Sequence, residues 1–498
     1  MSNNIRLRFA PSPTGYVHIG SLWGALFVYL IAKSLDGKII LRIEDTDQER
    51  RVKGAVSNLI RVLSWAGIEF DESPEKGGPF APYIQTERLD IYKKYAEELI
   101  QKKEAYYCFC SKERLAEMRA KQNAEKLPPR YDGLCAHLSS EEIEVKLKEG
   151  AKYVIRQKMP QEGEVVVHDE LRGEIKFQAC DLDDHVLMKA NGIPTYHLAS
   201  VVDDHEMQIS HVTRGQEWLP SFPKNILLYK SFGWEAPKFI HLPVILDKAG
   251  GKLSKRKGNV AVEDYIQDGY LPEALINFCA LMGWHPKDDN EELTIDEIIS
   301  KFKIEDMGIS SPVFDIEKLD YFNGLYIRKK PLTQLVEACK YYLEKYWQDK
   351  ERSEKISKKF SKFSDKFIEN VVRLEQERMR RLSEIGELTK FFFLGELDYD
   401  QELLIWKKLS AEDVKVNLEK TYELLDKIPE ENWTNDSIED CLITYLKAKE
   451  FKVGDYLWPM RVSLTGEKAS PSPFDVAEVL GKKITLERIE KAAQKLKT

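Results

Sequence analysis

Two residues near the N-terminus, His18 and Gly20, have the types and the spacing to handle phosphate. They follow a Pro-rich turn, Pro11 to Gly15, and precede an apolar stretch, Ser21 to Lys33, that reads as a helix. The N-terminus of a helix offers backbone N–H groups to phosphate oxygens. Gly20 would let a phosphate chain approach closely, and His18 could donate to developing negative charge. Taken singly, these residues are better explained as a structural histidine and a turn glycine.

A second stretch, Asp247 to Gly258, is a glycine loop dense with cations. Lysines such as Lys252 and Lys255 could neutralise a polyphosphate as its leaving group departs. The loop is not a Walker loop, because Leu246 stands where the first glycine would be and Leu253 where the Ser or Thr would be. A solvated loop or a basic targeting patch is the alternative.

The elements that must position these loops read as strands of a parallel sheet. Arg6 to Ala10 alternates apolar and basic residues, and Lys38 to Arg42 has an apolar centre. We expect a third strand in the apolar run Leu198 to Val202, closed by a turn at Asp203 to His205, and a fourth at His241 to Leu246. Ligands of open α/β sheets bind beyond the carboxyl ends of the strands. We therefore expect the loops that follow these strands to share one rim.

Four further side chains on these elements are candidates for binding an amino acid. Glu44 follows a strand, and its carboxylate could bind an ammonium group or belong to a solvated acidic turn. The guanidinium groups of Arg8 and Arg214 could each grip a carboxylate through two charge-assisted hydrogen bonds. A surface ion pair is the alternative for Arg214, and a core position is the alternative for Tyr196.

A cysteine cluster follows, with Cys108 and Cys110 in a C-x-C pair and Cys135 and His137 in a C-x-H pair. Three thiols and an imidazole can hold zinc tetrahedrally as a closed structural site. The alternative is a set of reduced, partly buried cysteines beside an ordinary turn.

Composition sets the class of protein. A chain of 498 residues predicts two to four domains, and 43% hydrophobic with 32% charged residues is typical of soluble globular proteins. Neither a signal core nor a membrane-length apolar run is evident, and seven cysteines without an export signal predict reduced thiols in the cytoplasm. A net charge of −8 argues against indiscriminate nucleic-acid binding and leaves room for a local basic face.

Together the two loops carry a family resemblance. Pro-Ser-Pro-Thr-Gly-x-x-His-Ile-Gly from Pro11, with Lys-Leu-Ser-Lys-Arg from Lys252, resembles the two signatures of the class I aminoacyl-tRNA synthetases, in detail their glutamyl branch. The resemblance implies a catalytic role for His18, Lys252 and Lys255. It implies that glutamate is bound by Arg8, Ala10, Ser12, Glu44, Tyr196 and Arg214. It implies that ATP is bound by His18, Gly20, Glu217, Leu246, Lys252, Ser254, Lys255 and Arg256. Some bacterial glutamyl enzymes also have the C-x-C and C-x-H pairs, which favours zinc at Cys108, Cys110, Cys135 and His137.

The predicted fold is an α/β Rossmann-type catalytic core with an α+β insertion, followed by an all-α C-terminal anticodon-binding region. We place the split core at 1–90 and 198–250, the acceptor-stem-binding insertion with the zinc knuckle at 91–197, a stem-contact domain with the second loop at 251–330, and two helical subdomains at 331–498. Basic residues between Lys358 and Arg381 are either a solvated helix face or phosphate contacts.

The resemblance implies ATP-dependent attachment of L-glutamate to tRNA(Glu), with Mg²⁺ accompanying ATP, tRNA required for activation, and a monomeric chain. Four alternatives stay open. A short paralogue that modifies a tRNA base lacks an anticodon domain and would end near Gly324. A non-discriminating enzyme would also glutamylate tRNA(Gln), and a non-catalytic tRNA-binding relative would keep only the binding surface. A glutaminyl enzyme would have β-barrels in place of the helical pattern that follows Pro331.

Overall fold

The computed structural model describes residues 5–253 and 260–496, and the chain divides into two compact units. The N-terminal unit comprises Met1–Tyr265 and Pro272–Ile316, and the C-terminal unit comprises Ile266–Leu271 and Glu317–Thr498. We describe each unit by itself.

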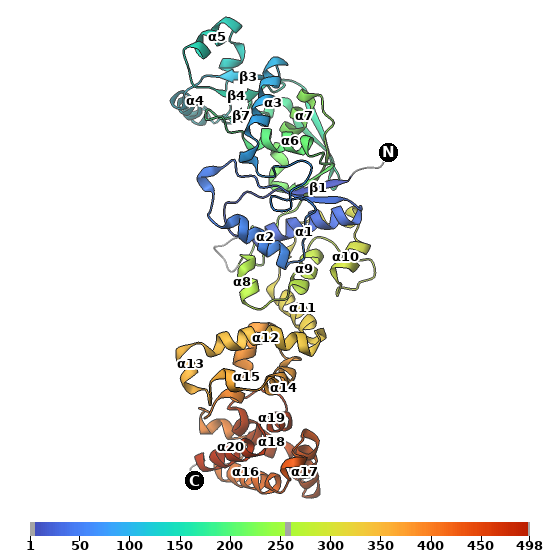
Figure 1. Ribbon diagram of the computed structural model, residues 1–498, viewed down its shortest axis with the longest axis vertical. Helices are drawn as coiled ribbons and strands as arrows, with labels where there is room; N and C mark the ends of the chain where they lie inside the picture. Colours follow the sequence, from blue (N-terminus) through green and yellow to red (C-terminus); the bar gives the residue numbers. More distant parts are fainter. Residues whose placement is uncertain (1–4, 254–259, 497–498) are drawn as a thin grey trace. The chain divides into compact units, whose positions relative to one another are not determined.

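A six-stranded sheet forms the centre of the N-terminal unit (Figure 1). In spatial order its strands are β2 (Lys38–Leu41), β1 (Arg6–Phe9), β8 (His211–Gly215), β9 (Lys238–Leu242), β5 (Glu164–Asp169) and β6 (Gly173–Gln178). Neighbouring strands are parallel except for the antiparallel hairpin β5–β6. That hairpin, which we had placed in the insertion, extends the core sheet through Asp169, which pairs with Phe239.

Helices cover both faces of this sheet. Helix α1 (Ile19–Ser34) packs on β1, β2 and β8, with α2 (Ala55–Trp65) nearby on the same side, and α3 (Leu89–Gln101), α6 (Tyr196–Glu206) and α7 (Phe222–Phe232) lie on the other side (Figure 1). The predicted strand at 198–202 is wrong, because these residues belong to α6. Leu198, Ala199, Val201 and Val202 are all buried, and a short run that is apolar all round does not distinguish a buried helix from a strand.

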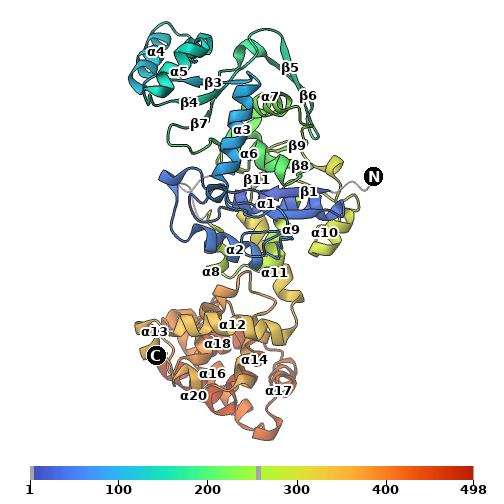
Figure 2. The ribbon, with the colours of Figure 1, turned by 45° about the horizontal axis from the view of Figure 1, so that its top comes forward.

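A smaller antiparallel sheet carries the cysteine cluster. Its strands are β3 (Ala105–Cys108), β4 (Val154–Gln157) and β7 (Val186–Met188), and helices α4 (Lys112–Ala124) and α5 (Ser140–Lys148) lie beside it (Figure 2). The remaining elements of the N-terminal unit are the parallel pair β10 (Leu246–Asp247) and β11 (Val313–Phe314), with α9 (Pro272–Leu281) and α10 (Ile295–Lys301) against α1. Helix α8 (Val262–Gln267) begins in this unit.

The described residues of the C-terminal unit form helices, as predicted from the sequence. They are α11 (Ile316–Lys329), α12 (Leu332–Trp347), α13 (Lys350–Lys355), α14 (Asp365–Glu375), α15 (Ile385–Phe393), α16 (Ala411–Asp426), α17 (Asn435–Ala448), α18 (Val453–Thr465), α19 (Pro473–Leu480) and α20 (Lys482–Lys495). The predicted fold class, an α/β core with a helical C-terminal region, is confirmed. Across residues 5–253 and 260–496, no helix is both long and apolar enough to cross a membrane.

Candidate active site

One cavity of the N-terminal unit gathers most of the residues that the sequence singled out. Its volume is about 740 Å³, and ten of the predicted residues line it: Arg8, Ala10, Ser12, His18, Gly20, Glu44, Tyr196, Arg214, Glu217 and Lys252. Leu246 is not among the described lining residues; it lies in β10, next to the lining residue Ile245. Ser254, Lys255 and Arg256 lie outside the described residues.

His18 caps the helix that opens onto this cavity. Its Nδ1 accepts a hydrogen bond of 2.9 Å from the backbone N–H of Gly20, so the imidazole is fixed at the N-terminus of α1. A Cβ added to Gly20 would lie 3.3 Å from that same Nδ1. The absence of a side chain at Gly20 therefore leaves room for the histidine ring, whereas the sequence predicts only that Gly20 lets a phosphate chain approach closely.

Arg214, at the carboxyl end of β8, is held in the cavity wall by neutral groups. Its Nε donates to His241 Nε2 at 3.0 Å, and its Nη1 donates to Asn225 Oδ1 at 3.0 Å and to the Tyr196 hydroxyl at 3.5 Å. Its Nη2 is buried and has no acceptor in the described part of the chain. None of the described carboxylates forms an ion pair with Arg214, so its full charge remains for an anionic ligand.

Arg8, the second predicted carboxylate reader, has a different environment. Its Nε donates to Asp204 Oδ1 at 2.9 Å and its Nη1 to the Thr213 carbonyl at 3.2 Å. The same Asp204 oxygen accepts from Arg42 Nη1 at 2.8 Å, and Arg42 Nη2 donates to Glu44 at 3.0 Å. Burial opposes ionisation of Asp204, yet the charges of Arg8 and Arg42 hold its pKa below the ordinary value. The charge of Arg8 is thus partly neutralised within the protein.

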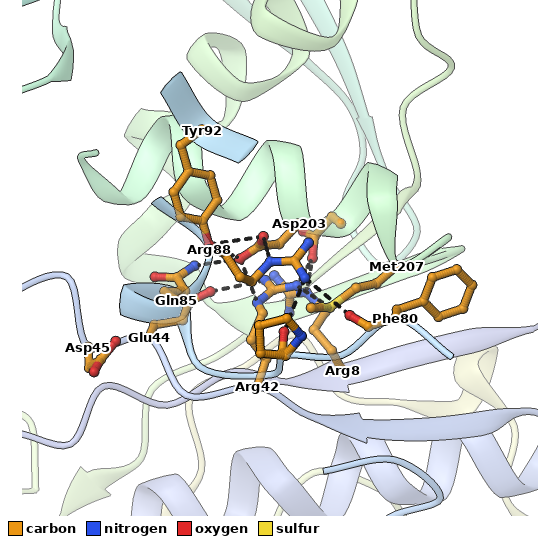
Figure 3. A network of polar contacts seen from close by, with 12 residues as sticks. Arg8, Arg42, Glu44, Asp45, Phe80, Gln85, Arg88, Tyr92, Asp203 and Met207 are labelled. Carbon is orange, nitrogen blue, oxygen red and sulfur yellow. Dashed lines mark hydrogen bonds and ion pairs between the residues drawn. The ribbon is translucent and has the colours of Figure 1, made fainter. Parts of the chain in front are cut away.

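Glu44 lies at the cavity end of this network (Figure 3). Burial raises the pKa of its carboxyl although Arg42 and Arg8 lower it. A ligand ammonium group beside Glu44 would favour the ionised form, because an opposite charge in a buried site stabilises the carboxylate.

The network continues away from the cavity around Asp203 (Figure 3). This carboxylate accepts from Arg88 Nε at 2.7 Å, from Gln85 Nε2 at 3.0 Å and from the Tyr92 hydroxyl at 2.9 Å, and it lies 3.6 Å from Arg42 Nε. The predicted strand-end turn at Asp203 to His205 is therefore wrong. Residues 203 and 204 are the last buried carboxylates of α6, and they fix the arginines beneath the cavity floor.

Elsewhere in the cavity lining, Lys252 forms an exposed ion pair with Glu217, with Nζ and Oε1 3.8 Å apart. Both side chains are at least half exposed, and an ion pair of this kind contributes at most about 1 kcal/mol. A polyphosphate can compete readily for this lysine.

Comparisons with known proteins agree with this geometry. Residues 4–321 match the family model described as tRNA synthetases class I (E and Q), catalytic domain, and residues 334–493 match an anticodon binding domain. This chain belongs to the class I tRNA synthetases of the E and Q family. It is 45% identical to a glutamate–tRNA ligase of Clostridium botulinum, covering 100% of this chain and 99% of the relative, and 42% identical to one of Pelodictyon phaeoclathratiforme with the same coverage. A solved glutamate tRNA ligase of Elizabethkingia meningosepticum, in complex with its amino acid, superposes with a TM-score of 0.90 at 35% identity over 99% of this chain and 100% of that one.

The cysteine cluster of this synthetase is only partly as predicted. Cys108, Cys110 and Cys135 lie with their sulfur atoms within 4.8 Å of one another, a spacing that fits ligands of one tetrahedral zinc ion. His137, the predicted fourth ligand, is exposed and is not part of this group. The hydroxyl of Tyr131 lies there instead, 3.4 Å from the sulfur atoms of both Cys108 and Cys110.

The basic residues predicted in the anticodon-binding region divide into two groups. Arg378 pairs with the buried Glu375 at 2.9 Å and Arg381 with the partly buried Glu384 at 3.3 Å, so these two arginines form ion pairs within the unit and do not lie on a solvated helix face. Lys358 and Lys362 instead line a second cavity of about 770 Å³ within the C-terminal unit, together with aromatic residues such as Phe363. These two lysines remain candidates for phosphate contacts.

Sequence reasoning missed the residues that hold the predicted ones in place. Arg42 was included in an apolar strand, and a charge within a buried strand was the available signal of a buried ion pair. His241 was noted only as the start of a strand, and Asp169 gave no signal because its partner lies far along the chain.

Proposed function

We propose that this synthetase attaches L-glutamate to tRNA(Glu) in two steps. The α-carboxylate of glutamate attacks the α-phosphorus of ATP in line, a new O–P bond forms, and pyrophosphate leaves to give glutamyl-adenylate. A hydroxyl of the terminal adenosine of tRNA then attacks the glutamyl carbonyl, and AMP leaves. No side chain acts as a nucleophile, because positioning and charge stabilisation carry the first step.

This proposal rests on the residues that line the cavity together with Arg214. A guanidinium without a carboxylate partner shares the cavity with His18 and Lys252, which resemble the phosphate-handling residues of the family. Arg214 would bind the side-chain carboxylate of glutamate, assisted by Arg8, and Glu44 would bind the amino group. A neutral glutamine amide would leave the charge of Arg214 without a counterion, so glutamine is disfavoured.

We assign the phosphates of ATP to His18, Gly20, Lys252 and the second loop, which includes Lys255, with Mg²⁺ accompanying ATP. We further propose that 91–197 contacts the acceptor stem, 251–330 the stem beyond it, and 331–498 the anticodon. A cytoplasmic location agrees with the seven cysteines, which are all free thiols.

We also propose one structural Zn²⁺ at Cys108, Cys110 and Cys135, with the Tyr131 hydroxyl rather than His137 nearest to the fourth position. Bound zinc would fix the loop that carries Cys135 to β3. The ion is structural and takes no part in the transfer of glutamate.

The test is charging of purified glutamate and glutamine tRNAs with labelled glutamate and, in parallel, with labelled glutamine. We expect glutamate on the glutamate tRNA only. Charging of both tRNAs with glutamate would show a non-discriminating enzyme, and charging of neither would refute the proposal. In the matched variant Lys255→Ala, pyrophosphate exchange with tRNA present should be lost while tRNA binding is kept, and unchanged exchange would refute the role of that lysine.

A further inference from the structure

Arg214 is the end of a buried chain of three side chains from three strands. Asp169, the last residue of β5, has its Oδ2 2.7 Å from Nδ1 of His241 on β9, and His241 Nε2 lies 3.0 Å from Nε of Arg214 on β8. Asp169 and His241 are both fully buried. Neither residue is in the lining of the cavity, so their contact with a ligand is indirect.

The chemistry of the groups fixes the direction of each hydrogen bond. An arginine Nε–H can only donate, so Nε2 of His241 must be the unprotonated acceptor. The proton of the neutral imidazole is then on Nδ1, and it is donated to Asp169. Burial opposes ionisation of Asp169, yet the bond from His241 lowers the pKa of that carboxyl. The backbone N–H groups of Leu171 and Arg172 also donate to it, which holds the carboxylate in place.

The neutral imidazole of His241 also separates the carboxylate of Asp169 from the guanidinium of Arg214. If a carboxylate accepted directly from Arg214, it would orient the guanidinium and neutralise it at the same time, as Asp204 does for Arg8. His241 supplies an acceptor without a charge, and Asn225 does the same at Nη1. Two of the three guanidinium nitrogens are therefore fixed in direction while the positive charge stays unpaired.

We propose that His241, held by Asp169, is a positioning residue that orients the Arg214 guanidinium toward the side-chain carboxylate of glutamate and so sets the enzyme's affinity for glutamate. This inference rests on the proposed function, in which Arg214 reads that carboxylate. Loss of the acceptor would let the guanidinium rotate away from its ligand and would leave ATP binding unaffected.

Two substitutions at the same position separate orientation of Arg214 from packing. The amide of His241→Asn lies where Nδ1 was, so it keeps a donor to Asp169 and offers nothing to Arg214. The longer amide of His241→Gln can place its carbonyl oxygen where Nε2 was, so it restores an acceptor for Arg214. We expect His241→Asn to raise the KM for glutamate about tenfold or more, since a hydrogen bond to a charged group is lost. We expect His241→Gln to recover most of the affinity, with the KM for ATP within about twofold of wild type in both.

The wild-type enzyme is assayed first by charging of glutamate tRNA, and failure there would refute the proposed function itself. If the wild type is active, equal KM values for glutamate in the two variants, or a parallel rise in the KM for ATP, would show a merely structural role. If either variant fails to fold, Asn225→Asp supplies a second test. That change keeps an acceptor for Nη1 of Arg214 but places a negative charge beside the guanidinium. It should therefore also raise the KM for glutamate, and an unchanged KM would overturn the inference.

Discussion

The buried ion network beneath the cavity predicts that Asp204→Asn destabilises the N-terminal unit strongly. Six charged groups balance there: the guanidiniums of Arg8, Arg42 and Arg88 and the carboxylates of Glu44, Asp203 and Asp204. Asparagine is nearly the same shape as aspartate and retains an oxygen that can accept from Arg8 and Arg42. The change therefore removes one negative charge and leaves an excess positive charge in a region where Asp204 is 4% exposed.

Removal of one partner of a buried ion pair costs about 3–5 kcal/mol, and we expect the lower end because the hydrogen bonds are retained. The matched control is Asp45→Asn. Asp45 is equally buried, but its hydrogen bonds, 3.0 and 2.8 Å, come from the neutral backbone N–H and hydroxyl of Thr86, and its ion pair with the exposed Arg51 is long, at 3.8 Å. We expect that control to cost no more than about 1 kcal/mol.

Amide hydrogen exchange of β1 and α6, measured by mass spectrometry in the full chain, reports the stability of this unit alone. Exchange should be about a hundredfold faster in Asp204→Asn than in wild type, and no more than about fivefold faster in Asp45→Asn. The double variant Asp204→Asn/Arg8→Gln restores the charge balance and should be less destabilised than the sum of its single changes. Equal effects of the two asparagine changes, or strict additivity in the double variant, would refute the reasoning.

Two further predictions concern the rest of the N-terminal unit. Purified protein should contain one zinc ion per chain by elemental analysis. The variant Cys110→Ser should lose this zinc, whereas His137→Ala should retain it. Equal loss of zinc in the two variants would show that His137 is a ligand. Burial lowers the pKa of His197 to about 4 and that of its neighbour His185 well below its ordinary value. Both pKa values are depressed, so the stability contributed by the two neutral histidines is fully present above the unfolded pKa of about 6.5. The free energy of unfolding then falls as the pH falls toward 4, by about 3 kcal/mol for His197. The free energy of unfolding, measured with urea across this pH range, should show that loss. The loss should be smaller in His197→Phe, and an unchanged dependence on pH would contradict the low pKa of His197.

The sequence predicted the catalytic fold where local signals were unambiguous. Turn residues before His18, alternation in the first strands and glycine-rich cationic chemistry after Leu246 all indicated loops at the ends of strands, and most of the residues chosen there share one cavity. The failure at 198–205 has a physical cause. Helix α6 is buried on several sides, so its apolar residues lack the one-sided pattern that reveals an amphipathic helix. With that helix misread as a strand, Asp203 and Asp204 were assigned to a turn.

Most of the supporting contacts could not be predicted, because they join residues that are distant in sequence. Asp204 is 196 positions from Arg8, and Asp169 is 72 positions from His241. Nothing local to either pair specifies the other partner. The sequence thus indicated Arg8 and Arg214 as equivalent readers of a carboxylate, and only the structure shows that one has a buried counterion and the other does not.

This difference sets the charge that the cavity presents to a ligand. Several charged side chains of the lining are already paired: Arg8 with Asp204, Arg50 with Asp47, and Lys252, more loosely, with Glu217. Lys189 contributes a further cation, whose Nζ donates to the Thr46 carbonyl. Arg214 has only neutral acceptors. The cavity therefore presents an unneutralised positive charge at Arg214, and this follows from the neutrality of the imidazole and amide that hold it.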